Sequence, residues 1–257
     1  MTKPALNATR NGSRLSHHLA ELGFNSQAPS HKNFAERVGQ LIGLPGSLVL
    51  SALPLKPVIN SSNPSSEKAQ AIQADFLQQH NELIQFIGKC FDNSETRRRF
   101  RLPEVDADSF LDSKSTQVLY QRFYIAMQTE LASKAYSLHS LVRDAATDCS
   151  PALKQLCTLD KAMQEILSGQ LRKAYSQIPA VVAQRYQHWQ QQFSAADSSE
   201  QHDAIADDAI SAAIEQFCQE LRQLLLTELD ARLQTTYGLI EALNQQVTPA
   251  TTGNNKP

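Results

Sequence analysis

The sequence predicts an all-α protein: an elongated antiparallel bundle of long helices with a small N-terminal subdomain of three short helices. Glycine accounts for only 9 of the 257 residues, and alanine, glutamine and leucine are abundant, which favours helix over sheet. Apolar residues also recur with a helical period over several long stretches, and prolines fall between these stretches. Together these observations indicate helices that each bury one face against their neighbours.

The longest periodic stretch is residues 203–247, which contains no proline and one glycine, Gly238. Its apolar residues recur on average every ~3.7 residues, close to the α-helical period of about 3.6. They are Ile210, Ile214, Phe217, Leu221, Leu225, Leu229, Leu233, Tyr237, Ile240, Leu243 and Val247. Ser198 and Gln201 match a capping box upstream, and Pro249 follows the last apolar residue. We therefore expect one continuous helix, which needs a partner face of similar length because long helices gain most of their stability from packing.

The N-terminal subdomain, residues 14–56, follows a polar segment at 1–13 that we expect to be a disordered tail. Three short helices are predicted in it, at 14–23, 31–42 and 46–52. Gly23 and Gly43 stand where the first two of these helices are expected to end.

The third short helix, residues 46–52, is almost purely apolar. It carries no Lys, Arg, Asn or Gln, which a DNA-reading helix needs to reach bases and phosphates. We therefore interpret it as a helix that packs on the rest of the chain or on a partner, with Leu48, Val49 and Leu50 as candidate partner contacts.

A linker rich in proline, serine and asparagine, residues 57–66, precedes the long-helix bundle at 67–248, and 249–257 forms a second expected tail. The helices predicted in the bundle are 67–91, 116–147, 152–175, 179–193 and 203–247. Ser150 is a suitable N-cap, and Pro151 suits the first position of the helix that follows. The short connections favour antiparallel neighbours.

The only basic run is Arg97-Arg98-Arg99-Phe100-Arg101. Such a run can contact phosphate groups or acidic lipids. Four carboxylates follow it closely, at Glu104, Asp106, Asp108 and Asp112. Because opposite charges within a Debye length of about 10 Å largely cancel, we interpret the run as locally neutralised. The candidate anion contacts are Arg97, Arg98, Arg99 and Arg101.

No sequence pattern predicts catalysis, a cofactor or a metal ion. A glycine-rich phosphate loop and an E-x-x-H pair are both missing. The four cysteines form no C-x-x-C pair and are expected to be reduced and mostly buried, while the seven histidines are far apart except for His17 and His18. We predict that the protein is not an enzyme and has no catalytic, cofactor-binding or metal site.

The formal net charge of −2 gives no general electrostatic reason to bind nucleic acid or a membrane surface. The first residues lack the apolar core of a signal peptide, and no run of about eighteen apolar residues occurs. We therefore expect a cytoplasmic protein without a membrane span.

Three segments resemble an uncharacterised proteobacterial protein family known only as a domain of unknown function. They are residues 34–41 (FAERVGQL), 150–153 (SPAL) and 159–165 (LDKAMQE). The resemblance covers nearly the whole chain outside the tails. It implies a cytosolic accessory to a bacterial envelope complex, encoded beside an OmpA-like envelope protein and a coiled-coil membrane protein.

Long amphipathic helices without chemical motifs favour a non-enzymatic scaffold or adaptor that binds other proteins through apolar helix faces. Two alternatives remain: a nucleic-acid-associated protein that uses Arg97–Arg101, and a helical-bundle enzyme or ligand binder whose site is assembled from distant residues. We also expect a homodimer or larger species, because Leu224, Leu225 and Leu226 in succession put apolar groups on more than one side of their helix. Leu224 and Leu226 are therefore further candidate partner contacts.

Overall fold

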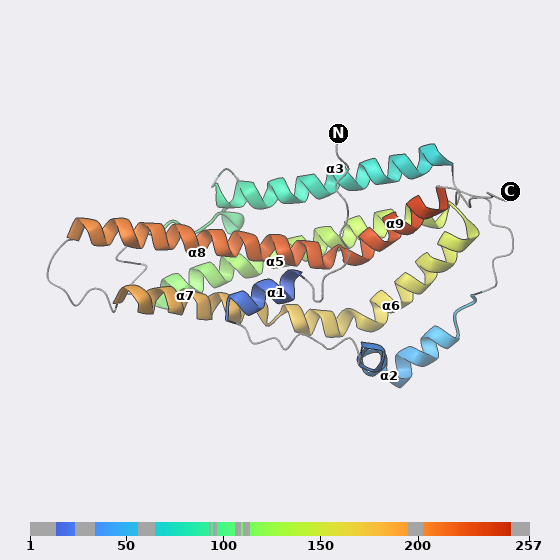
Figure 1. Cartoon of the computed structure of the whole chain (residues 1–257), viewed down its shortest axis with the longest axis horizontal. Coiled ribbons are helices and arrows are strands. Elements are labelled where there is room, and N and C mark those ends of the chain that lie inside the picture. Colours follow the sequence, from blue (N-terminus) through green and yellow to red (C-terminus); the bar gives the residue numbers. More distant parts are fainter. Residues whose placement is uncertain are drawn as a thin grey trace, which may run out of the picture.

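The computed structural model describes residues 14–23, 34–55, 65–92, 94, 97–105, 109, 114–194 and 203–247. Throughout these ranges the regular elements are helical, and the long helices run roughly along a common axis while α2 lies at an angle to it (Figure 1), which confirms the all-α bundle. The elements are α1 (Arg14–Glu21), α2 (Phe34–Ser51), α3 (Ser66–Phe91), η2 (Arg98–Phe100), α5 (Lys114–Thr147), α6 (Pro151–Tyr175), α7 (Ile178–Ser194), α8 (Asp203–Arg232) and α9 (Gln234–Val247).

Helix α5 is the central element of the bundle. It packs against α3, α6, α7, α8, α9 and the short η2. Its buried residues include the adjacent pair Phe123 and Tyr124, which point to different sides of the helix. A helix that is apolar on several sides must be covered on several sides, so the other long helices pack on it from several directions, while residues such as Leu119 and Ile125 stay exposed.

Serine caps fix two helix starts. The Ser65 hydroxyl accepts a hydrogen bond from the Lys68 amide at the start of α3. The Ser150 hydroxyl accepts one from the Leu153 amide and donates one of 2.6 Å to Gln246 on α9. Ser150 therefore caps α6, as the sequence predicts, and also ties the α5–α6 corner to the end of the chain's last helix.

The predicted continuous helix over 203–247 is wrong in one respect, because it breaks at Leu233 into α8 and α9. The Leu233 amide is shared between the carbonyls of Leu229 (3.1 Å) and Asp230 (3.2 Å), and the Gln234 side chain also reaches the Asp230 carbonyl. Apolar residues spaced by four advance about 40° per step around a helix. A straight helix would therefore carry them off the core, and after the break Leu239 and Ile240 of α9 are buried.

The short N-terminal helices dock on different parts of the bundle. Helix α1 packs on α8, and α2 packs on α6 at the edge of the molecule (Figure 1). Gly43 interrupts α2 with a φ of 62°, which separates the predicted second and third short helices. A Cβ on Gly46 would lie 2.8 Å from the Ile166 side chain, so this glycine permits the close approach of α2 to α6.

Some predictions fall outside the described residues. These are the tails at 1–13 and 249–257, most of the linker at 57–66, and the capping box at Ser198 and Gln201.

Three aromatic rings join the helices at one end of the core. Tyr120, Tyr186 and Phe217 come from α5, α7 and α8, and their ring centroids lie 5.1 to 5.9 Å apart. All three side chains are almost fully buried. Burial raises the pKa of Tyr186 to about 12 from its ordinary value of 10.0.

We expect Tyr186→Phe to reduce the loss of stability at alkaline pH. The folded state holds the Tyr186 proton more tightly than the unfolded state, so this contribution is complete below about pH 10 and disappears as the pH rises through about 12. The shift corresponds to about 3 kcal/mol. Urea unfolding between about pH 9 and pH 12 measures it. The control, Tyr136→Phe, alters a tyrosine of α5 that is 59% exposed and should leave the profile unchanged.

Candidate functional site

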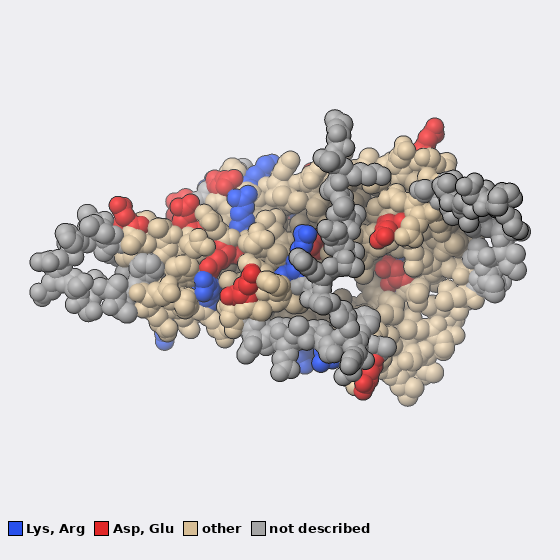
Figure 2. All heavy atoms as spheres, viewed as in Figure 1, with Lys and Arg blue, Asp and Glu red and all other residues tan. Residues whose placement is uncertain are grey.

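An exposed apolar face on α2 is the first candidate. Its large side chains include Leu44, which is 74% exposed, and Leu48, which is 62% exposed. Val49 is 48% exposed, while Leu50 is half-buried. No charged residue occurs from 38 to 55. Figure 2 shows few charged side chains over the edge of the molecule where Figure 1 places α2 and α6.

Leu224, a predicted partner contact, has a side chain that is 1% exposed, so it is covered within the chain in this conformation. Leu226 is partly buried and packs against the core. The reason is that α8 is covered by α1, α3, α5 and α7, so apolar groups on several of its sides are used within the chain.

The basic run forms η2 and packs against aromatic rings. The Arg97 guanidinium lies over the rings of Phe86 (5.4 Å) and Phe100 (4.7 Å), and that of Arg99 lies 4.4 Å from the Phe100 ring centre. Both arginines also pair with Glu130 on α5, at 3.6 and 3.7 Å. Arg98 and Arg101 are exposed.

Glu130 is therefore a carboxylate that pairs with two arginines of the run. Sequence spacing could not reveal it, because it lies about thirty residues away on another helix. Of the four acidic residues expected to neutralise the run, Glu104 is described, whereas Asp106, Asp108 and Asp112 fall outside the described residues. Exposed pairs of this kind contribute about 0.2–1 kcal/mol each, so the contact orients η2 more than it stabilises the fold.

A carboxylate is fully buried at the centre of the bundle. Glu228 on α8 is 0% exposed and accepts hydrogen bonds from the Tyr124 hydroxyl (2.9 Å) and the Gln128 amide (3.0 Å) on α5. Arg232 donates two more to it, at 2.9 and 2.6 Å, and lies 3.7 Å from the Tyr175 ring centre on α6. Burial, and then the Glu228 charge, hold the pKa of Tyr124 well above 10.0. Both oxygens of the Glu228 carboxylate thus accept two hydrogen bonds each. A buried carboxylate is tolerated only when its oxygens are satisfied in this way.

A second polar cluster links α5, α6 and α9. His139 lies 3.0 Å from the Thr236 hydroxyl and 2.7 Å from the Asp160 carboxylate, which also accepts from Arg143. Hydrolase triads have a similar order of contacts, with a Ser or Cys nucleophile where Thr236 stands here. Thr236 is 0% exposed, however, so no substrate can reach its hydroxyl in this conformation. We interpret this cluster as a structural contact that holds α5, α6 and α9 together.

A hollow of about 220 Å³ lies between α1, α3 and α8. Its lining residues are Arg14, His80, Ile84, Gln223, Leu226, Thr227, Leu229 and Asp230. His80 reaches the Tyr237 hydroxyl at 3.1 Å, and burial lowers the pKa of His80 against the opposing effect of Asp230. Small-molecule pockets usually span about 300–1,000 Å³, so this hollow is nearer the size of one or two side chains.

In the described part of the chain, no cluster of three or more His, Cys, Asp or Glu side chains is placed to hold a metal ion. Among the helices described, none combines the length and the hydropathy that a bilayer crossing requires.

The fold and these clusters define an all-helical bundle whose apolar core contains two hydrogen-bonded polar clusters, with an apolar outer helix. The chain belongs to the family DUF3348, described as a protein of unknown function, whose model matches residues 1–245. This confirms the resemblance to an uncharacterised family. No curated protein and no solved structure matches the chain.

Neutralising the buried carboxylate should destabilise the protein strongly. We expect Glu228→Gln to lower the free energy of unfolding by about 3–5 kcal/mol, because it leaves the Arg232 charge without its counter-ion. The matched control is Glu215→Gln, an exposed carboxylate of the same helix, which should cost less than about 0.5 kcal/mol. Chemical denaturation at neutral pH measures both, and equal effects would contradict this assignment.

Proposed function

We propose that the protein is a non-enzymatic helical scaffold or adaptor that binds another protein through the exposed face of α2. The observation that carries the proposal is the uncharged stretch from 38 to 55, in which Leu44 and Leu48 are mostly exposed to solvent. Apolar side chains grouped on one exposed helix mark interaction surfaces more often than isolated ones do.

The chemistry of this face defines the partner that fits it. A charged side chain on the partner would lose its hydration against α2 without gaining a counter-ion. We therefore expect a protein that presents an uncharged apolar helix face, as coiled-coil proteins do at their a and d positions. We further propose, as the resemblance implies, that the chain is a cytoplasmic accessory to a bacterial envelope complex with an envelope-associated coiled-coil partner.

Two observations favour this proposal over the alternatives. Arg97 and Arg99, which a nucleic-acid interface would use, are paired with Glu130 and stacked on aromatic rings. The hollow beside His80 is smaller than the usual small-molecule pocket.

The test is direct binding to a partner captured at the α2 face. A photo-crosslinking residue at position 48 should capture a protein in the native host. That protein, once purified, should bind the wild-type chain at least tenfold more tightly than it binds Leu48→Asp. The reason is that binding would remove water from the aspartate carboxylate without supplying a counter-ion. Calorimetry measures the affinities, and circular dichroism should show the same helix content in both chains.

The matched control is Leu119→Asp, which changes a leucine of α5 that is 47% exposed and lies away from α2. It should leave the affinity unchanged. Light scattering supplies the remaining readout. If Leu48→Asp turns a dimer into a monomer and no other protein binds, the α2 face serves self-association and the adaptor proposal fails.

A further inference from the structure

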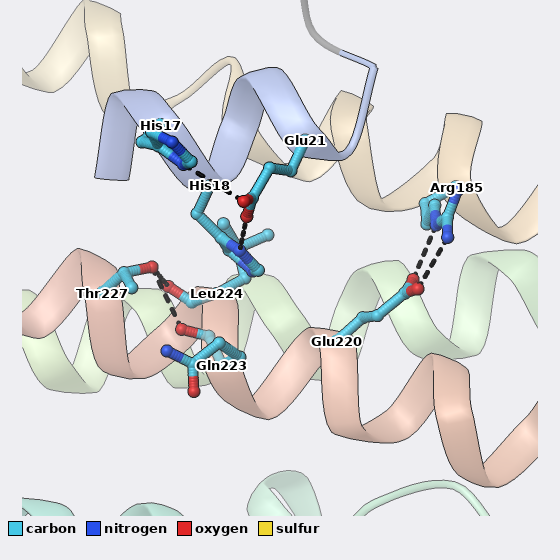
Figure 3. Close-up of polar contacts among 8 residues, drawn as sticks. All are labelled: His17, His18, Glu21, Arg185, Glu220, Gln223, Leu224 and Thr227. Atoms are coloured by element: carbon cyan, nitrogen blue, oxygen red, sulfur yellow. Dashed lines mark hydrogen bonds and ion pairs between the residues drawn. The ribbon is translucent and has the colours of Figure 1, made fainter. Parts of the chain in front are cut away.

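The surface of α8 that α1 covers, called here the seat of α1, has the features of a helix-binding groove. Leu15 is 8% exposed, and Leu19 and Leu22 are partly buried against the same core. These leucines follow the i, i+4, i+7 spacing with which amphipathic helices fill apolar grooves. Figure 3 shows α1 lying across α8, with His18 directed between the two helices toward Leu224.

One buried atom in this contact is unsatisfied. The Nε2 atom of His18 is out of contact with solvent and has no hydrogen-bond partner in the described part of the chain. The other ring nitrogen, Nδ1, lies 3.4 Å from Glu21 within α1 itself. Nearby on α8, the Thr227 hydroxyl donates to the carbonyls of its own helix, at 3.0 Å, and so offers no hydrogen to His18 (Figure 3). A buried polar atom without a partner weakens the contact that buries it.

The groove is also longer than the helix that occupies it. Arg14, the first residue of α1, lines the hollow between α3 and α8. The remaining lining residues belong to those two helices, among them Leu226 and Leu229 on α8. Among the described residues, a space of about 220 Å³ is therefore left open beside Arg14 at the N-terminal end of α1, with Asp230 as an acidic group in its lining.

Helix α1 is only eight residues long, too short to be stable without packing. The helical structure of α1 thus depends on its contact with α8. This contact leaves open space beside Arg14 and is weakened by the unsatisfied Nε2 atom of His18.

We propose that α1 is a displaceable occupant of a helix-binding groove on α8. The ligand that fits is an amphipathic helix of a partner protein with leucine-like side chains at i, i+4 and i+7. It carries an apolar residue in place of His18, further apolar residues to fill the hollow, and a basic residue to face Asp230. This groove is separate from the α2 face, and the proposal does not depend on the function proposed for that face.

Because α1 is tethered to the groove it occupies, an incoming helix binds only to the fraction of molecules in which α1 has left. Changes in α1 docking should therefore change the affinity of an external helix by the same factor.

The first experiment compares two adjacent histidines in the full chain by hydrogen exchange. His18→Leu removes the unsatisfied buried nitrogen, so the α1 amides should exchange about tenfold more slowly while those of α5 are unchanged. The matched control is His17→Leu, whose side chain is 77% exposed and also contacts Glu21. It should leave α1 exchange unchanged. Equal effects of the two substitutions, or faster exchange in His18→Leu, would overturn the proposal.

The second experiment measures occupancy of the groove with a defined probe. The probe is a labelled peptide of residues 14–23 that carries His18→Leu. It should bind the full-chain variant Leu15→Asp/Leu19→Asp, in which α1 cannot dock, at least tenfold more tightly than wild type. It should bind full-chain His18→Leu most weakly. Affinity that is equal for all three chains, or absent for the undocked variant while circular dichroism shows it folded, would refute an exchangeable groove.

Discussion

The architecture depends on the need to cover α5. This helix is apolar on more than one side, and each side requires a neighbour long enough to exclude water from it. Helices α3, α6, α7, α8 and α9 supply these faces. The long stretch from 203 to 247 is therefore one of several covers, although its length and regular apolar spacing make it the most prominent feature of the sequence.

Apolar packing alone leaves the register of such helices weakly defined, since a shift of one turn replaces one apolar residue by another. The buried polar groups differ in this respect. The Oε2 atom of Glu228 has donors only where α5 presents Tyr124 and Gln128 to it. His139 contacts both Asp160 and Thr236 only when α5, α6 and α9 are in one register. A shifted bundle would bury these groups without partners, at a cost of several kcal/mol each. We propose that the polar clusters select one alignment among several that are similar in apolar contact.

Local features of the fold could be predicted because their causes are local. Ser150 and Pro151 mark the start of α6, and Gly43 divides α2, since capping and positive φ depend on a few neighbouring residues. The break at Leu233 was missed because the average apolar spacing, which is close to 3.6, hides the unbroken succession of four-residue steps from Phe217 to Tyr237. The burial of Leu224 was missed for a different reason, since whether an apolar side is free depends on which other helices reach it.

The polar clusters could not be predicted, because Tyr124 and Glu228 are about a hundred residues apart in sequence. No local pattern connects two such positions in a single sequence. The pairing of Glu130 with the basic run could not be predicted for the same reason. The burial of His18 could not be predicted either, because it depends on the opposing surface of α8.

The glycine at the α2–α6 contact has a consequence for how the family can diverge. A Cβ on Gly46 would lie 2.8 Å from the Ile166 side chain and 2.8 Å from the Ile42 side chain, so an alanine or serine there requires both neighbours to give way. A change at position 46 therefore depends on changes at its neighbours, whereas either isoleucine can become smaller while Gly46 stays. Where relatives keep these residues, α2 keeps its tilt on the bundle; where they change together, its outer surface is presented at a different angle.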